Sequence, residues 1–508
     1  MAFSDVVATV GAGPWVAYMM CAVLLALLLY SLFSPASLRH IPTEGGSSLP
    51  LVSYLGAYNV LRNLQSVLQR GYDKHKGKAF KIALPDRWVV VLTGKTLVDE
   101  LQRMPEESAS FIDATTELTG FGYIWGPRMR KDPCHVPIIR NQLTRQLSSA
   151  FGDIYEEIEL SFQGLMPACE KDWTPVHVIE VARDVVARAS NRVFVGLRVC
   201  RNPDYLDMLV DCAVSVASAR NTLMLFPFVL KTFAAKNVVN MDRRIRRGMQ
   251  HLGPIIEERM SLLRSLGNDW PDKPDDMLQW IIDEVAARQM PKEDVVRNIM
   301  FLNFAAIHTS SNSFTHAIYH LAANPDYLGP LREEVEAVTA KEGWSKTAMG
   351  RMWRIDSFLR ESQRVNSINP LTVIRRTRTS LTLSDGTFIP EGTVVAAPAY
   401  PTHFDDENYV GGDTFDPWRY VREKEQDLSP SKHQYVTLSP EYVPFGLGKR
   451  ACPGRFFAAN ELKAMLAYLV VNYDVKFEKE GVRPENMHVG LTISPDPAAK
   501  VLFRKRRS

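Results

Sequence analysis

The sequence predicts a mostly helical α+β fold with small β-sheets, preceded by a single membrane helix. Three observations lead to this prediction. Helical periodicity fills the middle of the chain, strand-like alternation is short and local, and one long apolar run stands near the N-terminus. The 508 residues are 23% charged and 46% hydrophobic, which is ordinary for a globular protein. These values exclude a disordered chain, a collagen-like chain and a polytopic membrane protein.

The charge balance and the cysteine content exclude two further classes. Lys and Arg number 60 against 57 Asp and Glu, a net charge of +3, so no excess of basic residues points to nucleic acid. Six cysteines in a chain of this length are too few for a disulfide scaffold. The chemistry must therefore be sought in local motifs.

The apolar run occupies residues 15–33 and lies in a stretch without charge between Asp5 and Arg39. It is long enough for a helix to cross the ~30 Å hydrocarbon core of a bilayer. A cleaved signal peptide is the alternative, but no positive segment precedes the run. We expect a retained single-pass anchor over residues 1–34, with membrane lipid around it and the rest of the chain on the cytosolic side.

Prolines and glycines over residues 35–50 predict a linker, and residues 51–508 show no second linker or repeat, so they are expected to form one domain. Short strands are predicted at residues 79–83 and 88–92, and a hairpin around residues 381–395 at the Asp385-Gly386 turn. Helices are predicted over residues 151–165, 176–192, 241–266, 276–288, 293–323, 352–365 and 458–471.

Cys452 differs from the other cysteines because of its surroundings, Pro-Phe-Gly-Leu-Gly-Lys-Arg-Ala-Cys-Pro-Gly-Arg from position 444. Gly446 lets the backbone turn tightly against a flat ligand, and Phe445 supplies an aromatic wall. The helix expected after the cysteine favours a thiolate at its N-terminus. A thiolate of this kind is an axial ligand of haem iron. Arg450 is placed to meet an acidic substituent of the same cofactor.

This loop matches Phe-Gly-x-Gly-x-Arg-x-Cys-Pro-Gly and resembles the haem-binding loop of the cytochrome P-450 superfamily. The resemblance covers residues 45–508 and implies the cytochrome P-450 fold, haem b as the cofactor and Cys452 as the ligand of its iron. Three phrases, at residues 304–310, 356–364 and 456–462, further resemble fungal secondary-metabolism members, such as those of mushroom-forming fungi.

The resemblance also implies a network that supports the haem loop. Glu361 and Arg364 are three residues apart on a predicted helix, a spacing that places them on one face. Arg419, in Phe-Asp-Pro-Trp-Arg, resembles the family's arginine between that helix and the cysteine loop. Together the three are expected to form a buried, structural ion network.

The long helix carries Ala-Ala-Ile-His-Thr-Ser at residues 305–310, where the family has small-Gly-x-acid-Thr. By this resemblance Thr309 lies in the distal pocket and helps to deliver protons to dioxygen. His308 replaces the usual carboxylate and is expected to relay protons in its place. A pocket-edge histidine without that role is the alternative.

The haem propionates are expected to meet basic residues. Arg376 aligns with a family arginine that binds one propionate, a chemically sensible pairing. For the other, the family uses a Trp and an Arg on an early helix. The Trp is absent here, which leaves His135, Arg140 and Arg145 as candidates.

By resemblance, apolar segments with few charges form the substrate pocket, which suits a hydrophobic small molecule. A terpenoid or steroid-like secondary metabolite is the expected substrate. The pocket is expected to draw on residues 111–125 and 221–228, and on Phe304, Ala305, Leu371, Val373 and Leu491.

The implied activity is a monooxygenase that inserts one atom of O2 into its substrate. The chain carries no flavin or nicotinamide fingerprint, so NADPH and flavins are expected in a separate cytochrome P-450 reductase at the endoplasmic reticulum. A basic patch for this partner would comprise Lys432, His433, Lys449, Arg450 and Arg455. Two alternatives stay open: a haem-thiolate isomerase or dehydratase that needs no reductase, and a non-enzymatic haem sensor or carrier.

Overall fold

The structure is a computed structural model that describes residues 38–49, 52–131, 133–226, 228–268, 270–427 and 430–507. The predicted membrane anchor and residues 35–37 and 50 of the linker lie outside these ranges. Among the helices that the structure describes, none combines the length and apolarity needed to cross a bilayer.

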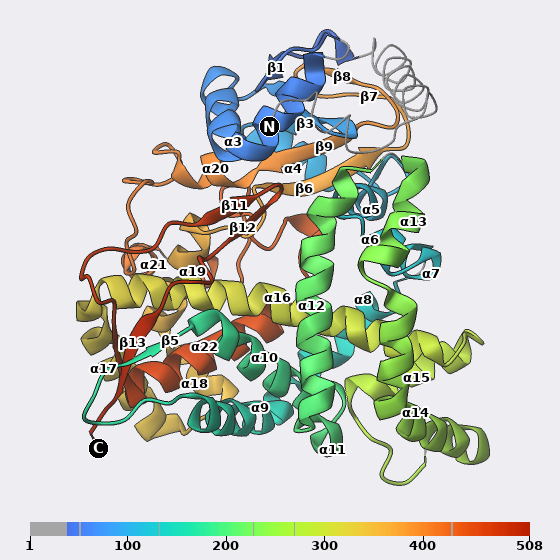
Figure 1. Ribbon diagram of the computed structural model, residues 1–508. Helices are drawn as coiled ribbons and strands as arrows, with labels where there is room; N and C mark the ends of the chain where they lie inside the picture. The colour runs from blue at the N-terminus through green and yellow to red at the C-terminus, as the bar shows by residue number, and fades with distance from the viewer. Residues whose placement is uncertain are drawn as a thin grey trace, which may run out of the picture.

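Helix α16 (Glu293–Ala323) runs through the middle of the helical body (Figure 1). Its 31 residues pack against α10 (Val178–Phe194), α12 (Pro203–Met224) and α14 (Met241–Leu266). Apolar residues surround the helix, as expected for a segment buried on every side. The main hydrophobic core of the protein therefore follows α16.

The largest sheet lies at one end of this body, above the helices in Figure 1. Its order is β1-β2-β3-β9-β6-β4, with parallel pairs β1–β2 and β3–β9 and the other neighbours antiparallel. The strands are β1 (Thr43–Glu44), β2 (Ala79–Leu84), β3 (Arg87–Leu92), β4 (Ala109–Ser110), β6 (Leu371–Thr377) and β9 (Val394–Pro398).

Strand β6 contains an irregularity that matters for the site. Leu371 pairs with Pro398, but Arg375 pairs with Val395, so β6 holds one extra residue between them. Val373 lies in this bulge at φ 48°, a conformation that β-branched residues rarely adopt. A bulge of this kind redirects the side chains that follow it.

Three small sheets complete the strands: β10-β13-β5, β11-β12 and β7-β8. The hairpin predicted at the Asp385-Gly386 turn is present. Its two strands are β7 (Leu381–Thr382) and β8 (Phe388–Ile389). The others are β5 (Thr174–Val176), β10 (Tyr473–Lys476), β11 (Met487–Val489), β12 (Thr492–Ser494) and β13 (Val501–Lys505).

The predicted helices are confirmed, and the bounds of α14 and α16 agree to the residue. Three begin or end within a few residues of the prediction: α15 (Met277–Ala287), α19 (Trp353–Val365) and α22 (Arg455–Asn472). Helix α9 (Thr144–Leu165) begins seven residues earlier than predicted, where the π-helical turn Ile139–Leu143 leads into it. The fold is therefore mostly helical with small sheets.

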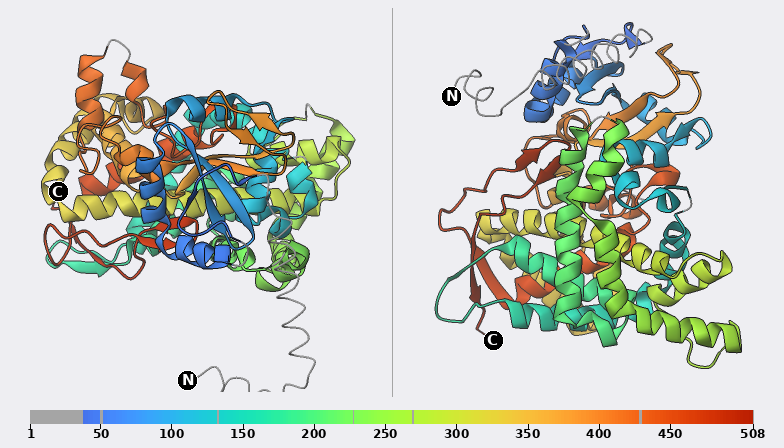
Figure 2. Two further views of the ribbon diagram at one scale, coloured as in Figure 1. Left: turned by 90° about the horizontal axis from the view of Figure 1, so that it is seen from above. Right: turned by 45° about the vertical axis from the view of Figure 1, so that its right-hand side comes forward.

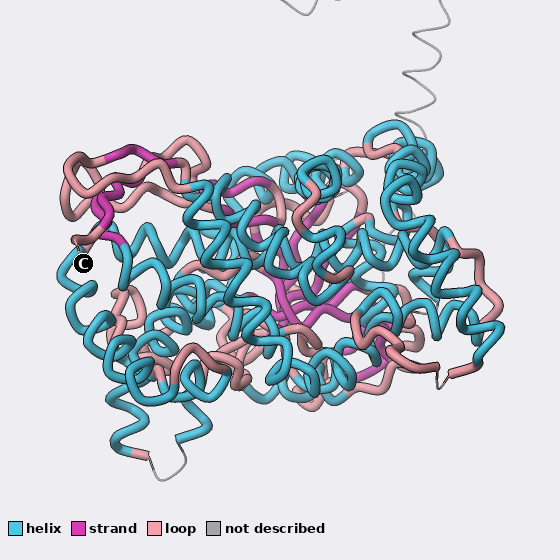
Figure 3. The backbone as a smooth tube through the Cα atoms, turned by 90° about the horizontal axis from the view of Figure 1, so that it is seen from below, coloured by secondary structure: helices cyan, strands magenta, loops and turns pink. Residues whose placement is uncertain are grey.

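Two views show how the parts are arranged. From above, the strands of the large sheet lie beside α3 (Val52–Lys74), and the described chain begins close to this helix (Figure 2). From below, helices surround the strands on most sides (Figure 3). Of the predicted site residues, some lie on α16 in the helical body, some on β6 in the large sheet and some in the segment before α22.

Candidate active site

The loop before α22 holds Cys452 at the N-terminus of that helix. Gly446 (φ 73°) and Gly448 (φ 65°) adopt the left-handed conformation that glycine permits at little cost. A Cβ on Gly448 would lie 1.8 Å from Oε1 of Gln102, so space also requires glycine there. The N–H of Cys452 donates to the carbonyl of Phe445 at 2.8 Å and closes the loop.

Cys452 is exposed by surface area, although burial raises the pKa of its thiol. A side chain with both properties borders a space inside the protein rather than open solvent. The N–H groups of Gly454 and Arg455 and the Arg455 charge oppose that rise in pKa, because all three favour the thiolate. The loop thus offers one accessible sulfur, with nearby N–H donors and a positive charge that offset part of the effect of burial on its thiolate, an arrangement that suits a ligand to iron.

Helix α16 also has exposed residues within an otherwise buried region of the protein. After its first residue, Ala305 and Thr309 are the exposed residues of this helix, and they lie one turn apart on one face. The Thr309 hydroxyl donates to the carbonyl of Ala305 at 2.7 Å, a common contact for a helical threonine. A face with exposed residues in the middle of a buried helix lines an internal space.

His308 lies beside Thr309 in surroundings that keep it neutral. Burial and the charges of Arg183 and Arg220 lower its pKa to about 4. Its ring stacks on Phe304 with 6.0 Å between the ring centres. Near neutral pH the imidazole therefore has one donor and one acceptor nitrogen.

The network predicted for Glu361, Arg364 and Arg419 is present and fully buried. Arg364 donates from Nε and Nη2 to the two Glu361 oxygens at 2.8 and 2.7 Å, and both side chains are inaccessible. Arg419 Nε lies 3.3 Å from Glu361 Oε1.

The remaining donors of the two arginines bond to carbonyls of the segment before Arg419, at Val410, Gly411, Gly412 and Thr414. Every charge in the network is paired and hydrogen-bonded, the condition under which buried ions persist.

The two neighbouring arginines of β6 lie in different surroundings. Arg376, the predicted propionate partner, lies with Nε 2.7 Å from Oε1 of Glu117, and about a third of its side chain is exposed. Arg375 is instead buried at 1% exposure, and its Nη2 has no partner. The bulge in β6 explains this difference, because it places Arg375 opposite Val395 and Arg376 opposite Val394. Sequence reasoning missed Arg375, since adjacent arginines carry no signal of which one faces inward.

Arg375 has no ion pair in the part of the chain that the structure describes. Burial lowers its pKa to about 10, and the charge of Arg450 adds to this effect. The charge of Glu106 acts in the opposite direction and raises the pKa of Arg375. Oε2 of Glu106 also lies 2.9 Å from Nη2 of Arg450. An orphaned buried guanidinium next to the cysteine loop is suited to a carboxylate supplied by a cofactor.

The three early-helix candidates have different partners. His135 is buried, and its Nδ1 lies 3.0 Å from Oδ1 of Asn298 on α16. Burial lowers the pKa of His135 to about 4. Arg140 donates to the carbonyl of Lys449 at 2.6 Å, which places it at the cysteine loop. Arg145 contacts its own helix turn, through the carbonyl of Asn141.

The expected pocket residues divide between three clusters. Leu371 and Leu491 pack together in the cluster that also contains Leu118 and Met224. Phe304 belongs to the main core, where Phe121 contacts it edge-on. Val373 packs instead with Val395, Val443 and Leu447, on the side of the cysteine loop. Val373 is thus separated from the other predicted pocket residues by the bulge in its strand.

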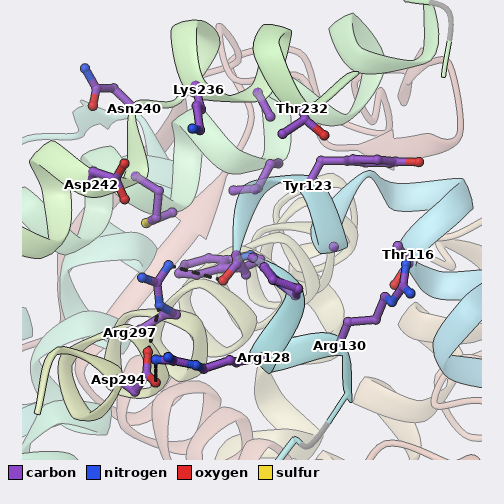
Figure 4. Close-up of a pocket in the computed structure, with 17 residues that line it drawn as sticks. Thr116, Tyr123, Arg128, Arg130, Thr232, Lys236, Asn240, Asp242, Asp294 and Arg297 are labelled. Carbon is purple, nitrogen blue, oxygen red and sulfur yellow. Dashed lines mark hydrogen bonds and ion pairs between the residues drawn. The ribbon is translucent and has the colours of Figure 1, made fainter. Parts of the chain in front are cut away.

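A cavity of about 670 Å³ lies where residues 116–130 meet α13 (Phe228–Val238), α14 and the start of α16 (Figure 4). Its lining includes Tyr123 and Trp125, from the segment predicted to contribute to the pocket. Arg128 and Arg297 both pair with Asp294 at its edge, and Lys236 faces them across the cavity. A smaller cavity next to it shares Trp125 and is lined by His135.

The basic patch expected for a redox partner is partly neutralised. His433 contacts Glu423 at 3.1 Å and Asp427 at 3.0 Å, and Lys432 lies 4.0 Å from the same Asp427. Lys449 is exposed without an ion pair among the described residues. Acidic neighbours therefore offset part of the positive charge that the sequence suggests for this patch.

Comparison with known proteins agrees with this geometry. The cytochrome P450 family model matches residues 43–503. The chain is 46% identical to cytochrome P450 monooxygenase 151 of Postia placenta, over 97% of this chain and 98% of that protein. It is 37% identical to a cytochrome P450 monooxygenase of Ganoderma lucidum, over 92% of both chains. An ent-kaurene oxidase of Fusarium fujikuroi is 29% identical over 97% of this chain and 93% of that protein.

The family match covers nearly all of the described residues, and the relatives are matched over nearly their full length. The chain therefore belongs to the cytochrome P450 family, and it is an enzyme of the monooxygenase kind.

Proposed function

We propose that the chain binds haem b through Cys452 and inserts one oxygen atom from O2 into a hydrophobic small molecule. The observation that carries this proposal is the accessible sulfur of Cys452, held at a helix N-terminus by a loop that requires two glycines. When bound, a thiolate-ligated haem supplies the activation of dioxygen that side chains alone cannot perform.

On the cysteine side, the residues of the chain hold the cofactor and its charge. The N–H groups of Gly454 and Arg455 stabilise the Cys452 thiolate. Arg375 replaces Arg376 in our assignment, because its unpaired guanidinium is suited to a propionate. Arg450 and Arg140 are the further candidates beside the loop, and Arg140 contacts it through the Lys449 carbonyl.

On the opposite side, the exposed face of α16 positions a hydroxyl and an imidazole. The Thr309 hydroxyl carries a proton at Oγ1. It donates this proton to the carbonyl of Ala305 and can rotate toward a ligand. His308 is neutral and can accept a proton at one nitrogen while the other nitrogen donates. The small side chain of Ala305 leaves room beside them.

The substrate in this proposal is a terpenoid or steroid-like secondary metabolite. Leu371, Leu491 and Phe304 supply apolar walls, which suit a ligand with few polar groups. One relative is named an ent-kaurene oxidase, so an enzyme of similar sequence carries a name that refers to a diterpene hydrocarbon. Both observations support this class of substrate.

The organisation proposed for the full chain is a membrane anchor at 1–34, a linker at 35–50 and a catalytic domain at 51–508. Electrons would come from an NADPH-dependent cytochrome P-450 reductase, which supplies the flavins. We place the protein at the endoplasmic reticulum with the domain on the cytosolic side.

The experiment is a spectrum of the reduced full-length protein with CO, followed by turnover with a reductase in a terpenoid-producing host. We expect a red-shifted Soret band that Cys452→Ser removes and that Cys169→Ser, a change at another exposed cysteine, leaves intact. An unchanged band in Cys452→Ser would refute the ligand assignment. Product formation without reductase or NADPH would favour an isomerase or dehydratase.

A further inference from the structure

Arg220 on α12 is a charged side chain without a charged partner. Its Nη1 donates to Oδ1 of Asn369 at 3.2 Å and to Oγ1 of Thr492 at 3.4 Å, and both acceptors are neutral. Its Nε is buried without a partner. No carboxylate forms an ion pair with Arg220 across the described ranges of the chain. This guanidinium therefore has unused hydrogen-bonding capacity.

Burial strongly affects the pKa of Arg220, although part of the residue's surface stays accessible to solvent. It lowers the pKa of the guanidinium to about 10, and no charged group contributes to the shift. The side chain is nevertheless only partly buried by surface area. The part of Arg220 that stays accessible therefore borders a space that a ligand can reach.

The position of Arg220 places that space beside the proposed substrate pocket. Asn369 lies two residues before Leu371, and Thr492 directly follows Leu491. The charge of Arg220 helps to lower the pKa of His308, so the guanidinium lies within electrostatic range of that residue of α16. The segment before β6 and strand β12 thus meet α12 at one cationic group.

An unpaired buried charge is costly, and proteins usually pair it or neutralise it. Lys463 and Arg364 follow that rule, because Lys463 contacts Asp356 at 2.7 Å and Arg364 pairs with Glu361, whereas Arg375, proposed to meet a propionate, has no ion pair among the described residues. Arg220 departs from it at a place where a ligand can supply the missing partner. Arginine presents a planar set of donors that matches a carboxylate.

We propose that Arg220 recognises a carboxylate on an otherwise apolar substrate and is a specificity-determining residue of this enzyme. The proposal rests on the proposed function, since it assumes that the space beside α16 receives the substrate. It narrows the substrate class to acids, such as terpenoid acids, whose apolar part contacts residues such as Leu371 and Leu491. Asn369 and Thr492 hold the guanidinium in place.

The test measures equilibrium binding by the full-length, haem-loaded protein at pH 7.5. The probes are abietic acid and methyl abietate, which share one diterpenoid skeleton, and palmitic acid with methyl palmitate as a second pair. Kd values come from ligand-induced changes in the haem spectrum, and calorimetry checks them. We expect the acid of at least one pair to bind about 10- to 100-fold more tightly than its ester, as a charge-assisted hydrogen bond contributes.

Arg220→Gln should abolish this preference by weakening acid binding and leaving ester binding unchanged, and Arg220→Lys should retain part of it. Arg183→Gln is the matched control, because Arg183 also lowers the pKa of His308 but lies on α10. It should leave the acid-to-ester ratio intact. The thermal stability of ligand-free Arg220→Gln should not fall, since the variant loses an unpaired buried charge.

Equal binding of acid and ester, or a ratio that survives Arg220→Gln, would overturn the proposal. Failure of both acids to bind would also overturn it. Neither result affects the red-shifted band of the CO complex, so loss of the Arg220 assignment is distinguishable from loss of the haem-thiolate function.

Discussion

The Nδ1 atom of His403 lies 2.9 Å from the main-chain oxygen of Arg364. Its Nε2 accepts the N–H of Val443 at 3.2 Å, one residue before the cysteine loop. Burial and the Arg364 charge lower the pKa of His403 to about 3, so the ring is neutral and donates from Nδ1. One imidazole thus connects the helix of the Glu361 network to the start of the loop that holds Cys452.

Replacement of this imidazole should loosen the loop. His403→Phe removes both hydrogen bonds and leaves a buried N–H at Val443 unpaired, which should cost roughly 2–4 kcal/mol. We expect a lower Tm and a larger fraction of reduced CO complex without the red-shifted Soret band. His177→Phe, at a partly exposed histidine bonded to one carbonyl, is the control and should change neither quantity.

The two adjacent arginines of β6 should differ in their effect on haem retention. Arg375→Met removes the unpaired buried guanidinium proposed to hold a propionate and should speed haem transfer to apomyoglobin by at least tenfold. Arg376→Met breaks a partly exposed ion pair with Glu117, which contributes less than about 1 kcal/mol. Its transfer rate should stay near that of the wild type. Equal rates in the two variants would contradict our assignment.

Thr309 and Ser311 give a matched pair of hydroxyls on α16. Both donate to the carbonyl four residues earlier, but Thr309 is exposed and Ser311 is buried. Thr309→Ala should uncouple turnover, with NADPH consumed several times faster than product forms, because the proton-bearing group is lost. Ser311→Ala should keep the ratio of product to NADPH. A fully coupled Thr309→Ala enzyme would remove Thr309 from proton delivery.

Buried histidines should make the fold sensitive to mild acid. The pKa values of His135 and His308 fall to about 4, and those of His316 and His320 lie well below the usual value, chiefly through burial. The unfolded chain takes up these protons near pH 6.5, whereas the folded chain does not. Stability is therefore complete above about pH 6.5 and falls as the pH approaches 4, by up to about 1.4 kcal/mol per pH unit for each histidine.

The measurement is Tm at pH 7.5, 6.0 and 5.0, a range in which unfolded carboxyl groups titrate little. His308→Gln should show a smaller loss of Tm between pH 7.5 and 5.0 than the wild type. A loss of the same size would mean that His308 is protonated in the folded protein.

The sequence was sufficient where a motif or a long periodic segment determined the structure. Helix α16 could be predicted to the residue because its sequence continues without a proline or glycine from Glu293 to Ala323. Glu361, Arg364 and Arg419 could be grouped because their order along the chain resembles the family pattern. Their buried contacts confirm that grouping.

The sequence was insufficient where a local distortion or a distant contact decided the outcome. The inward arginine of β6 depends on a bulge, and strand periodicity cannot reveal an extra residue. Arg220 looks like any charged residue of an amphipathic helix. Its lack of a charged partner is evident only in the folded chain, where α12, β12 and the segment before β6 meet.

The bulge at Val373 has a consequence for how this strand tolerates changes in length. A deletion of Ile374 would restore regular pairing with β9 and would leave Arg375 opposite Val395 and Arg376 opposite Val394. The bulge thus absorbs the one extra residue of this strand. The arginine that faces inward should therefore stay the same when the strand is shortened at this position.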